Sequence, residues 1–203
     1  MLENFNDFKF ILLGETNVQE REDPVSAFAK VKTKLKQADL LFGHMEGLLY
    51  PPTINSDVND LPFKEGWKHS EPGMVNAFID AGFDVVSNAS NVAYGSEAIE
   101  STIETLEKSG IKYCGIGRNI EEAKSPAIVE KRGLKFGFLS YTSVFWPTGM
   151  EAASARAGVS TISAKTYYQP HKRTIEMPEV PPIVRTEPDS KQLKAMEDSI
   201  KKL

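Results

Sequence analysis

The sequence predicts an α/β protein in which a largely parallel sheet carries helices on both faces. Short apolar runs typical of buried strands alternate with longer segments whose apolar residues fall on one helical face. Because parallel strands need a crossover between them, this alternation through the first half of the chain favours a parallel sheet. With 203 residues, of which 40% are hydrophobic, the chain is long enough for one domain with a sizeable core.

The expected strands are short apolar runs that end at a glycine or at a polar cluster. They lie at residues 8–13, 40–42, 85–86 and 112–115. Helices are expected from Pro24, at 74–81 and at 96–109. The last of these is the clearest, because Ile99, Ile103 and Leu106 form one stripe and Gly110 follows as a stop signal. Two further apolar runs, 127–131 and 134–141, flank Arg132-Gly133 and predict a hairpin.

The second half of the chain is less regular. Residues 143–188 hold several prolines, which predicts an irregular excursion from the core. Residues 189–203 return to helical spacing. Earlier in the chain, the polar stretch from Pro51 to Pro72 is long for a plain connection, so we expect a functional loop there.

Composition excludes several classes of protein. The formal net charge of −4 gives no strong basic field, so nucleic acid is not an expected partner. No apolar run approaches the ~20 residues of a membrane helix, and no signal peptide opens the chain, so we expect a cytoplasmic protein without a membrane span. The single cysteine, Cys114, excludes an intrachain disulfide and is expected to be a buried, inert thiol.

Polar residues follow the first three expected strands. Glu15 follows the first, His44 and Glu46 the second, and Asn88 and Asn91 the third. The carboxyl ends of parallel strands meet at one edge of a sheet, where α/β proteins bind ligands. Carboxylate, imidazole and amide groups are ligands for a divalent metal, so these residues predict a metal site. Solvated loop residues give the same spacing, and both interpretations stay open at this point.

The same segments resemble the capsule synthesis protein CapA (poly-γ-glutamate biosynthesis) family, which belongs to the calcineurin-like metallophosphoesterases. The resemblance rests on Leu13-Gly14-Glu15, on the segment from Ala38 to Gly47 and on the segment from Ala81 to Asn91. It continues through the following helix, the segment from Gly115 to Asn119 and the hairpin, and covers roughly residues 6–142. It implies a metallophosphatase-like layered sheet, with this chain, 1–203, as the N-terminal half of a larger domain.

The resemblance also implies roles for individual residues. Glu15 and Glu46 take the places of two metal-binding carboxylates, and Asn91 takes the place of the metal-binding Asn. His44 stands where the family has Asn and adds a nitrogen ligand, so the four residues are the expected ligands of one or two divalent ions (Mn, Fe or Zn). Val92 stands where the family has the His that protonates the leaving group, and valine transfers no proton.

Two functions follow from this pattern. One is a metal-dependent hydrolase with an altered site that cleaves a phosphoester or a γ-glutamyl or other amide bond in a small anionic or γ-glutamyl substrate. Its catalytic candidates are His44 and His69, although His69 lies in a loop where a solvated surface histidine is the alternative. The other function is a non-catalytic binding or assembly protein of capsule or poly-γ-glutamate metabolism. Because the family's remaining ligands would follow Leu203, we also expect a C-terminal-half chain or a second copy as partner.

Overall fold

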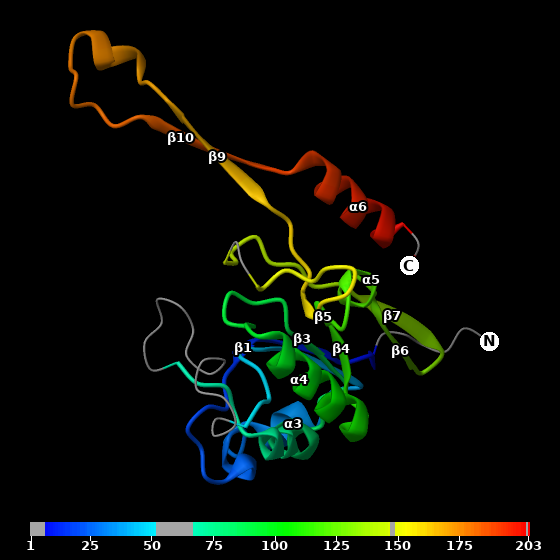
Figure 1. Ribbon diagram of the computed structural model, residues 1–203. Coiled ribbons are helices and arrows are strands. Elements are labelled where there is room, and N and C mark those ends of the chain that lie inside the picture. The colour runs from blue at the N-terminus through cyan, green and yellow to red at the C-terminus, as the bar shows by residue number, and fades with distance from the viewer. Residues whose placement is uncertain (1–6, 52–66, 147–148, 202) are drawn as a thin grey trace.

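The fold comes from a computed structural model, which describes residues 7–51, 67–146, 149–201 and 203. The functional loop expected between Pro51 and Pro72 lies largely outside these residues. The described residues form an α/β structure with a parallel sheet, as predicted, and a long ribbon that extends from it (Figure 1).

The central sheet contains four parallel strands in the order of the chain. They are β1 (Phe10–Thr16), β2 (Leu40–Met45), β3 (Val85–Ser87) and β4 (Lys112–Cys114). β1 was predicted as a buried strand, but it lies at the edge of this sheet and Leu12 is 62% exposed. The side chains that cover this face reach Phe10, whose ring contacts Phe136 and Phe138, and leave Leu12 open to solvent.

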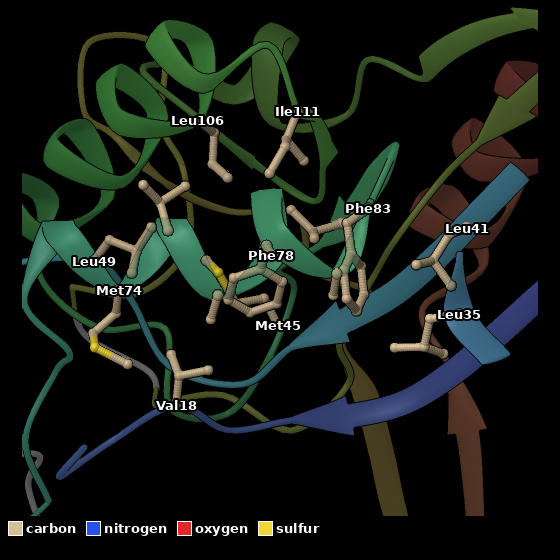
Figure 2. Close-up of a cluster of buried hydrophobic side chains, with 14 residues drawn as sticks. Val18, Leu35, Leu41, Met45, Leu49, Met74, Phe78, Phe83, Leu106 and Ile111 are labelled. Atoms are coloured by element: carbon tan, nitrogen blue, oxygen red, sulfur yellow. The ribbon is translucent and has the colours of Figure 1, made fainter. Parts of the chain in front are cut away.

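Short helices cover one face of the sheet. They are η2 (Pro24–Ser26), α1 (Lys32–Leu35), η3 (Pro72–Met74), α3 (Val75–Ala81) and α4 (Ser96–Ser109). Their buried side chains meet those of β2 and β3 in one apolar cluster, with Phe78 of α3 near its centre (Figure 2). Asp23 caps η2 by accepting a hydrogen bond from the backbone N–H of Val25, as its position before Pro24 predicted.

A hairpin covers the opposite face, where the sequence predicted helices. β6 (Ala127–Lys131) and β7 (Leu134–Phe138) are joined by Arg132 and Gly133, which both have positive φ. The ring of Phe138 stacks on that of Phe42 with centroids 5.1 Å apart. Cys114 is buried beneath this hairpin, and burial raises the pKa of its thiol to about 12. The alternating apolar residues of the hairpin thus supply the cover that a helix was expected to give.

The remaining elements continue from β4 to the ribbon. They are β5 (Ile116–Gly117), α5 (Ile120–Ala123), β8 (Gly158–Val159), β9 (Ala164–Gln169), η4 (Lys172–Ile175), β10 (Ile183–Pro188) and α6 (Ser190–Ile200). β9 and β10 form an antiparallel ribbon that projects away from the sheet (Figure 1). The sequence predicted an irregular segment here. The strands form because Tyr167, Tyr168 and Val184 favour extended backbone, while most of the prolines lie in the connection.

Candidate functional site

The carboxyl edge of the sheet is shaped by a bulge in β1. Leu13 pairs with Gly43 and Glu15 pairs with His44, so Gly14 is an extra residue between them. Leu13 packs into the helix-side cluster, and a Cβ on Gly43 would meet Phe83 of the same cluster. Since paired residues point to the same side of a sheet, Glu15 and His44 both project from the opposite face.

His44 is the centre of this edge. It pairs with Glu15 on one side and with Ser87 of β3 on the other, and its Nδ1 lies 2.8 Å from the Ser87 hydroxyl oxygen. Burial lowers the pKa of the imidazole, while the negative charges of Glu15 and Glu46 act in the opposite direction. Both carboxylates are therefore close enough for their fields to reach the ring.

Glu46 is held by the last residue of β1 and by the residue that follows it. Its backbone N–H donates to the carbonyl of Thr16 over 3.1 Å, and its carboxylate accepts a hydrogen bond of 3.3 Å from the side-chain amide of Asn17. The hydroxyl of Thr16 in turn donates to the carbonyl of His44 over 2.7 Å. Ser87 and Asn17 were not among the residues singled out from the sequence. Both residues lie at the end of a strand. The same position identified their neighbours as candidates and could have identified these two residues.

The segment after β3 contributes amide groups. Asn88 is fully buried, and its side-chain N–H donates to the carbonyl of Met45 over 3.5 Å. Its side-chain oxygen has no hydrogen-bond partner among the described residues. Asn91 is partly exposed, and its side-chain oxygen accepts a hydrogen bond of 3.4 Å from the Ser90 hydroxyl. Val92, which the resemblance aligns with the family's proton donor, has no exposed surface.

His69 is not the solvated surface histidine that was the alternative for this loop. It is 3% exposed, and its Nε2 lies 3.0 Å from the carbonyl oxygen of Tyr94. A carbonyl only accepts, so Nε2 carries the proton and Nδ1 is a buried acceptor, which has no hydrogen-bond partner in the part of the chain that the structure describes. Burial lowers the pKa of His69 to about 4, so the ring is neutral at neutral pH.

The donor types at this edge are those that bind divalent metals. Within the described residues, no three His, Cys, Asp or Glu side chains lie close enough together to hold a metal ion. The Nδ1 atom of His44 is already engaged with Ser87, and the side-chain oxygen of Asn91 with Ser90. These hydrogen bonds are what the structure shows at this edge.

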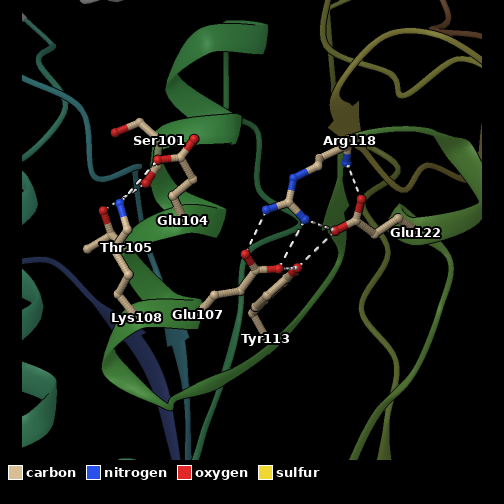
Figure 3. A network of polar contacts seen from close by, with 8 residues as sticks. All are labelled: Ser101, Glu104, Thr105, Glu107, Lys108, Tyr113, Arg118 and Glu122. Atoms are coloured by element: carbon tan, nitrogen blue, oxygen red, sulfur yellow. Dashed lines mark hydrogen bonds and ion pairs between the residues drawn. The ribbon is translucent and has the colours of Figure 1, made fainter.

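A second polar cluster lies at the far end of α4 and has a structural role (Figure 3). The Arg118 guanidinium donates to Glu107 over 2.7 Å and to Glu122 over 2.9 Å, and the hydroxyl of Tyr113 lies within hydrogen-bond distance of both carboxylates. Arg118 lowers the pKa of the Glu107 carboxyl. Because these groups bond to one another, the cluster joins α4 to α5.

The fold and the edge define an α/β protein of the open parallel-sheet class, with acidic, imidazole and amide side chains at the carboxyl ends of its strands. Residues 11–203 match the family model of the bacterial capsule synthesis protein PGA_cap, and the chain belongs to this family. Comparison with curated proteins gives no match. In the part of the chain that the structure describes, no helix combines the length and apolar character needed to cross a membrane.

Proposed function

We propose that this chain acts in capsule synthesis as a binding protein, and that Glu15, His44 and Glu46 form its binding edge. The observation that carries this proposal is the state of the residues that hydrolysis would need. The buried Val92 stands where the resemblance places the family's proton donor, and valine transfers no proton. The edge keeps the carboxylates of Glu15 and Glu46 as hydrogen-bond acceptors.

The chemistry of the edge indicates the class of ligand. Two carboxylates and a partly exposed amide, Asn91, present mainly acceptors, and they favour ligands rich in N–H or O–H donors. The proposed ligand is an uncharged, amide-bearing segment of a capsule polymer, whose amide N–H groups donate to Glu15 and Glu46. Hydrogen bonds to charged acceptors contribute about 1.5–3 kcal/mol each, which is enough for measurable selectivity.

Titration calorimetry with short γ-glutamyl oligomers whose α-carboxyl groups are amidated tests this proposal, because free α-carboxylates would be repelled by Glu15 and Glu46. Glu46→Gln removes the charge and keeps the shape, so binding is expected to weaken by about tenfold or more. Glu22→Gln, at an exposed position between β1 and η2, is the control for loss of one negative charge and should bind like the native chain. Absence of binding by the native chain, or equal weakening in both variants, would refute the proposed site.

A second candidate function is a metal-dependent hydrolase of phosphoester or γ-glutamyl bonds, with Glu15, His44, Glu46 and Asn91 as ligands of Mn, Fe or Zn. One observation favours it: the charges of Glu15 and Glu46 both act on the ring of His44, so the edge attracts positive charge. Metal content after dialysis against each ion distinguishes the two functions. Stoichiometric metal that is lost in Glu46→Gln and kept in Glu22→Gln would favour the hydrolase over the metal-free binding protein.

A further inference from the structure

The ribbon of β9 and β10 has two free edges with different chemistry. All residues of both strands are exposed, and the ribbon projects from the rest of the molecule, so both edges are sterically open (Figure 1). An isolated two-stranded ribbon is only marginally stable in water. This makes the edges the place to look for an additional strand.

The hydrogen-bond pattern shows which backbone groups face outward. The backbone N–H of Asp189 donates to the carbonyl of Ser163 over 2.7 Å, so these two residues form a hydrogen-bonded pair in register with the ribbon. Such pairs alternate along an antiparallel ladder. The Thr166–Thr186 pair is therefore of the closer, non-hydrogen-bonded kind, in agreement with hydroxyl oxygens 3.4 Å apart. At such pairs the backbone N–H and C=O of both residues point away from the ribbon.

The two edges differ in how well they are protected. On β9 the outward-pointing groups belong to Ala164, Thr166 and Tyr168, and all three residues have an N–H. On β10 the corresponding series ends at Pro188, which has no N–H. β10 also carries two charged residues and follows two prolines, whereas β9 carries a single charge. Prolines and charges are the usual protection of an edge strand, so β9 is the unprotected edge.

From this edge we infer that β9 pairs antiparallel with β9 of a second copy of the chain, with Thr166 opposite Thr166 on a two-fold axis. In this register Ala164 of one copy faces Tyr168 of the other, and every outward N–H and C=O of β9 finds a partner. Lys165 then lies opposite Tyr167, so no like charges face each other. A register centred one residue later would bring Pro170 opposite Ala164 and lose donors.

The same register places the uncharged faces of the two ribbons on the same side of the joined sheet. Ala164, Thr166 and Tyr168 share one face with their partners on β10, and none of these residues is charged. The other face carries the three charges of the ribbon, with Lys165 paired across from Glu187. Pairing about Thr166 joins the two uncharged faces into one face of a four-stranded sheet. The inference concerns the ribbon alone and is independent of the proposed binding function.

The size of the contact sets the strength expected. A six-residue strand is about 20 Å long, and pairing along it buries far less than the ~800 Å² per partner of a stable interface. The association is therefore expected to be weak and concentration-dependent. Cross-linking is the suitable assay, because it captures a weak complex in a defined geometry.

Two cysteine variants of the full chain test the register. In the dimer the Thr166 positions lie about 5.5 Å apart between Cα atoms, within disulfide range, whereas the Thr186 positions lie about 14 Å apart. Under mild oxidation Thr166→Cys should form disulfide dimers at least about tenfold faster than Thr186→Cys. Both positions are exposed, and they are cross-strand neighbours. Random collisions between monomers should therefore form disulfides at equal rates in the two variants. The buried Cys114 is common to both variants.

Sedimentation velocity over a concentration series gives an independent result. Thr166→Pro removes an outward N–H from the β9 edge, and Thr186→Pro removes one from the β10 edge, and neither N–H pairs within the ribbon. Thr166→Pro should be monomeric at concentrations where the native chain and Thr186→Pro associate. Equal cross-linking of the two cysteine variants, no cross-linking above background, or association that survives Thr166→Pro would each overturn the inference.

Discussion

His69 should make the folded state sensitive to acid. The ring is 3% exposed, its Nε2–H donates to Tyr94, and burial lowers its pKa from an ordinary 6.5 to about 4. Below pH 6.5 the unfolded chain therefore takes up a proton at this residue that the folded chain does not bind. Stability rises with pH wherever the unfolded state binds more protons, so the contribution of His69 is fully present above pH 6.5 and is lost as the pH falls toward 4.

The size of this effect follows from the two pKa values. Each pH unit in the window is worth about 1.4 kcal/mol for a single site. Between pH 6.5 and pH 4, His69 therefore removes about 3 kcal/mol from the free energy of unfolding. That is a large fraction of the 5–15 kcal/mol typical of a folded domain.

Urea denaturation of the native chain and of His69→Gln from pH 7.5 to pH 4 measures this loss of stability. The glutamine amide can still donate to the carbonyl of Tyr94 but does not titrate, so other acid-sensitive groups cancel in the comparison. The variant should be less stable by a constant amount above pH 6.5, and the difference should shrink by about 3 kcal/mol by pH 4. Parallel stability profiles across this range would show that His69 is protonated equally in the folded and unfolded states.

Three further outcomes are expected. Phe78→Ala should lower the free energy of unfolding by about 3–5 kcal/mol, because the ring is fully buried between Phe28 and Phe83, whereas Ile79→Ala at a 47% exposed position should cost much less; urea denaturation compares them. Gly117→Ala should destabilise the fold, because its Cβ would lie 2.1 Å from the backbone nitrogen of Ala123, whereas Gly73→Ala meets nothing within 4 Å and should not; thermal melting distinguishes them. Cys114, whose pKa burial raises to about 12, should react with a thiol reagent only when urea unfolds the chain, and fast labelling of the native protein would contradict its burial.

The elements that the sequence predicted best are those whose signals are local. The helix Ser96–Ser109 was placed correctly because an apolar stripe and a glycine stop agree, and Gly110 indeed has a positive φ. The hairpin at Arg132-Gly133 was placed for the same reason. That the hairpin covers one face of the sheet was not predictable. Strands with alternating apolar residues and an amphipathic helix can both bury an apolar face of the sheet. The ribbon was not predicted, because the prolines in the connection between its strands indicated irregular structure for the whole segment.

For the candidate site, the order of the strands could be predicted from the sequence, whereas the direction in which each side chain points could not. Alternation of strands and helices was enough to bring Glu15 and His44 to one edge, since parallel strands end on the same side. Their placement on one face depends on the extra residue at Gly14, because a slip of one residue turns a side chain to the opposite face of a sheet. Without the bulge, Glu15 would follow Leu13 onto the helix side, away from His44. The glycine is visible in the sequence, but the bulge is set by how β1 pairs with β2, and the electrostatic environment of His44 follows from that pairing.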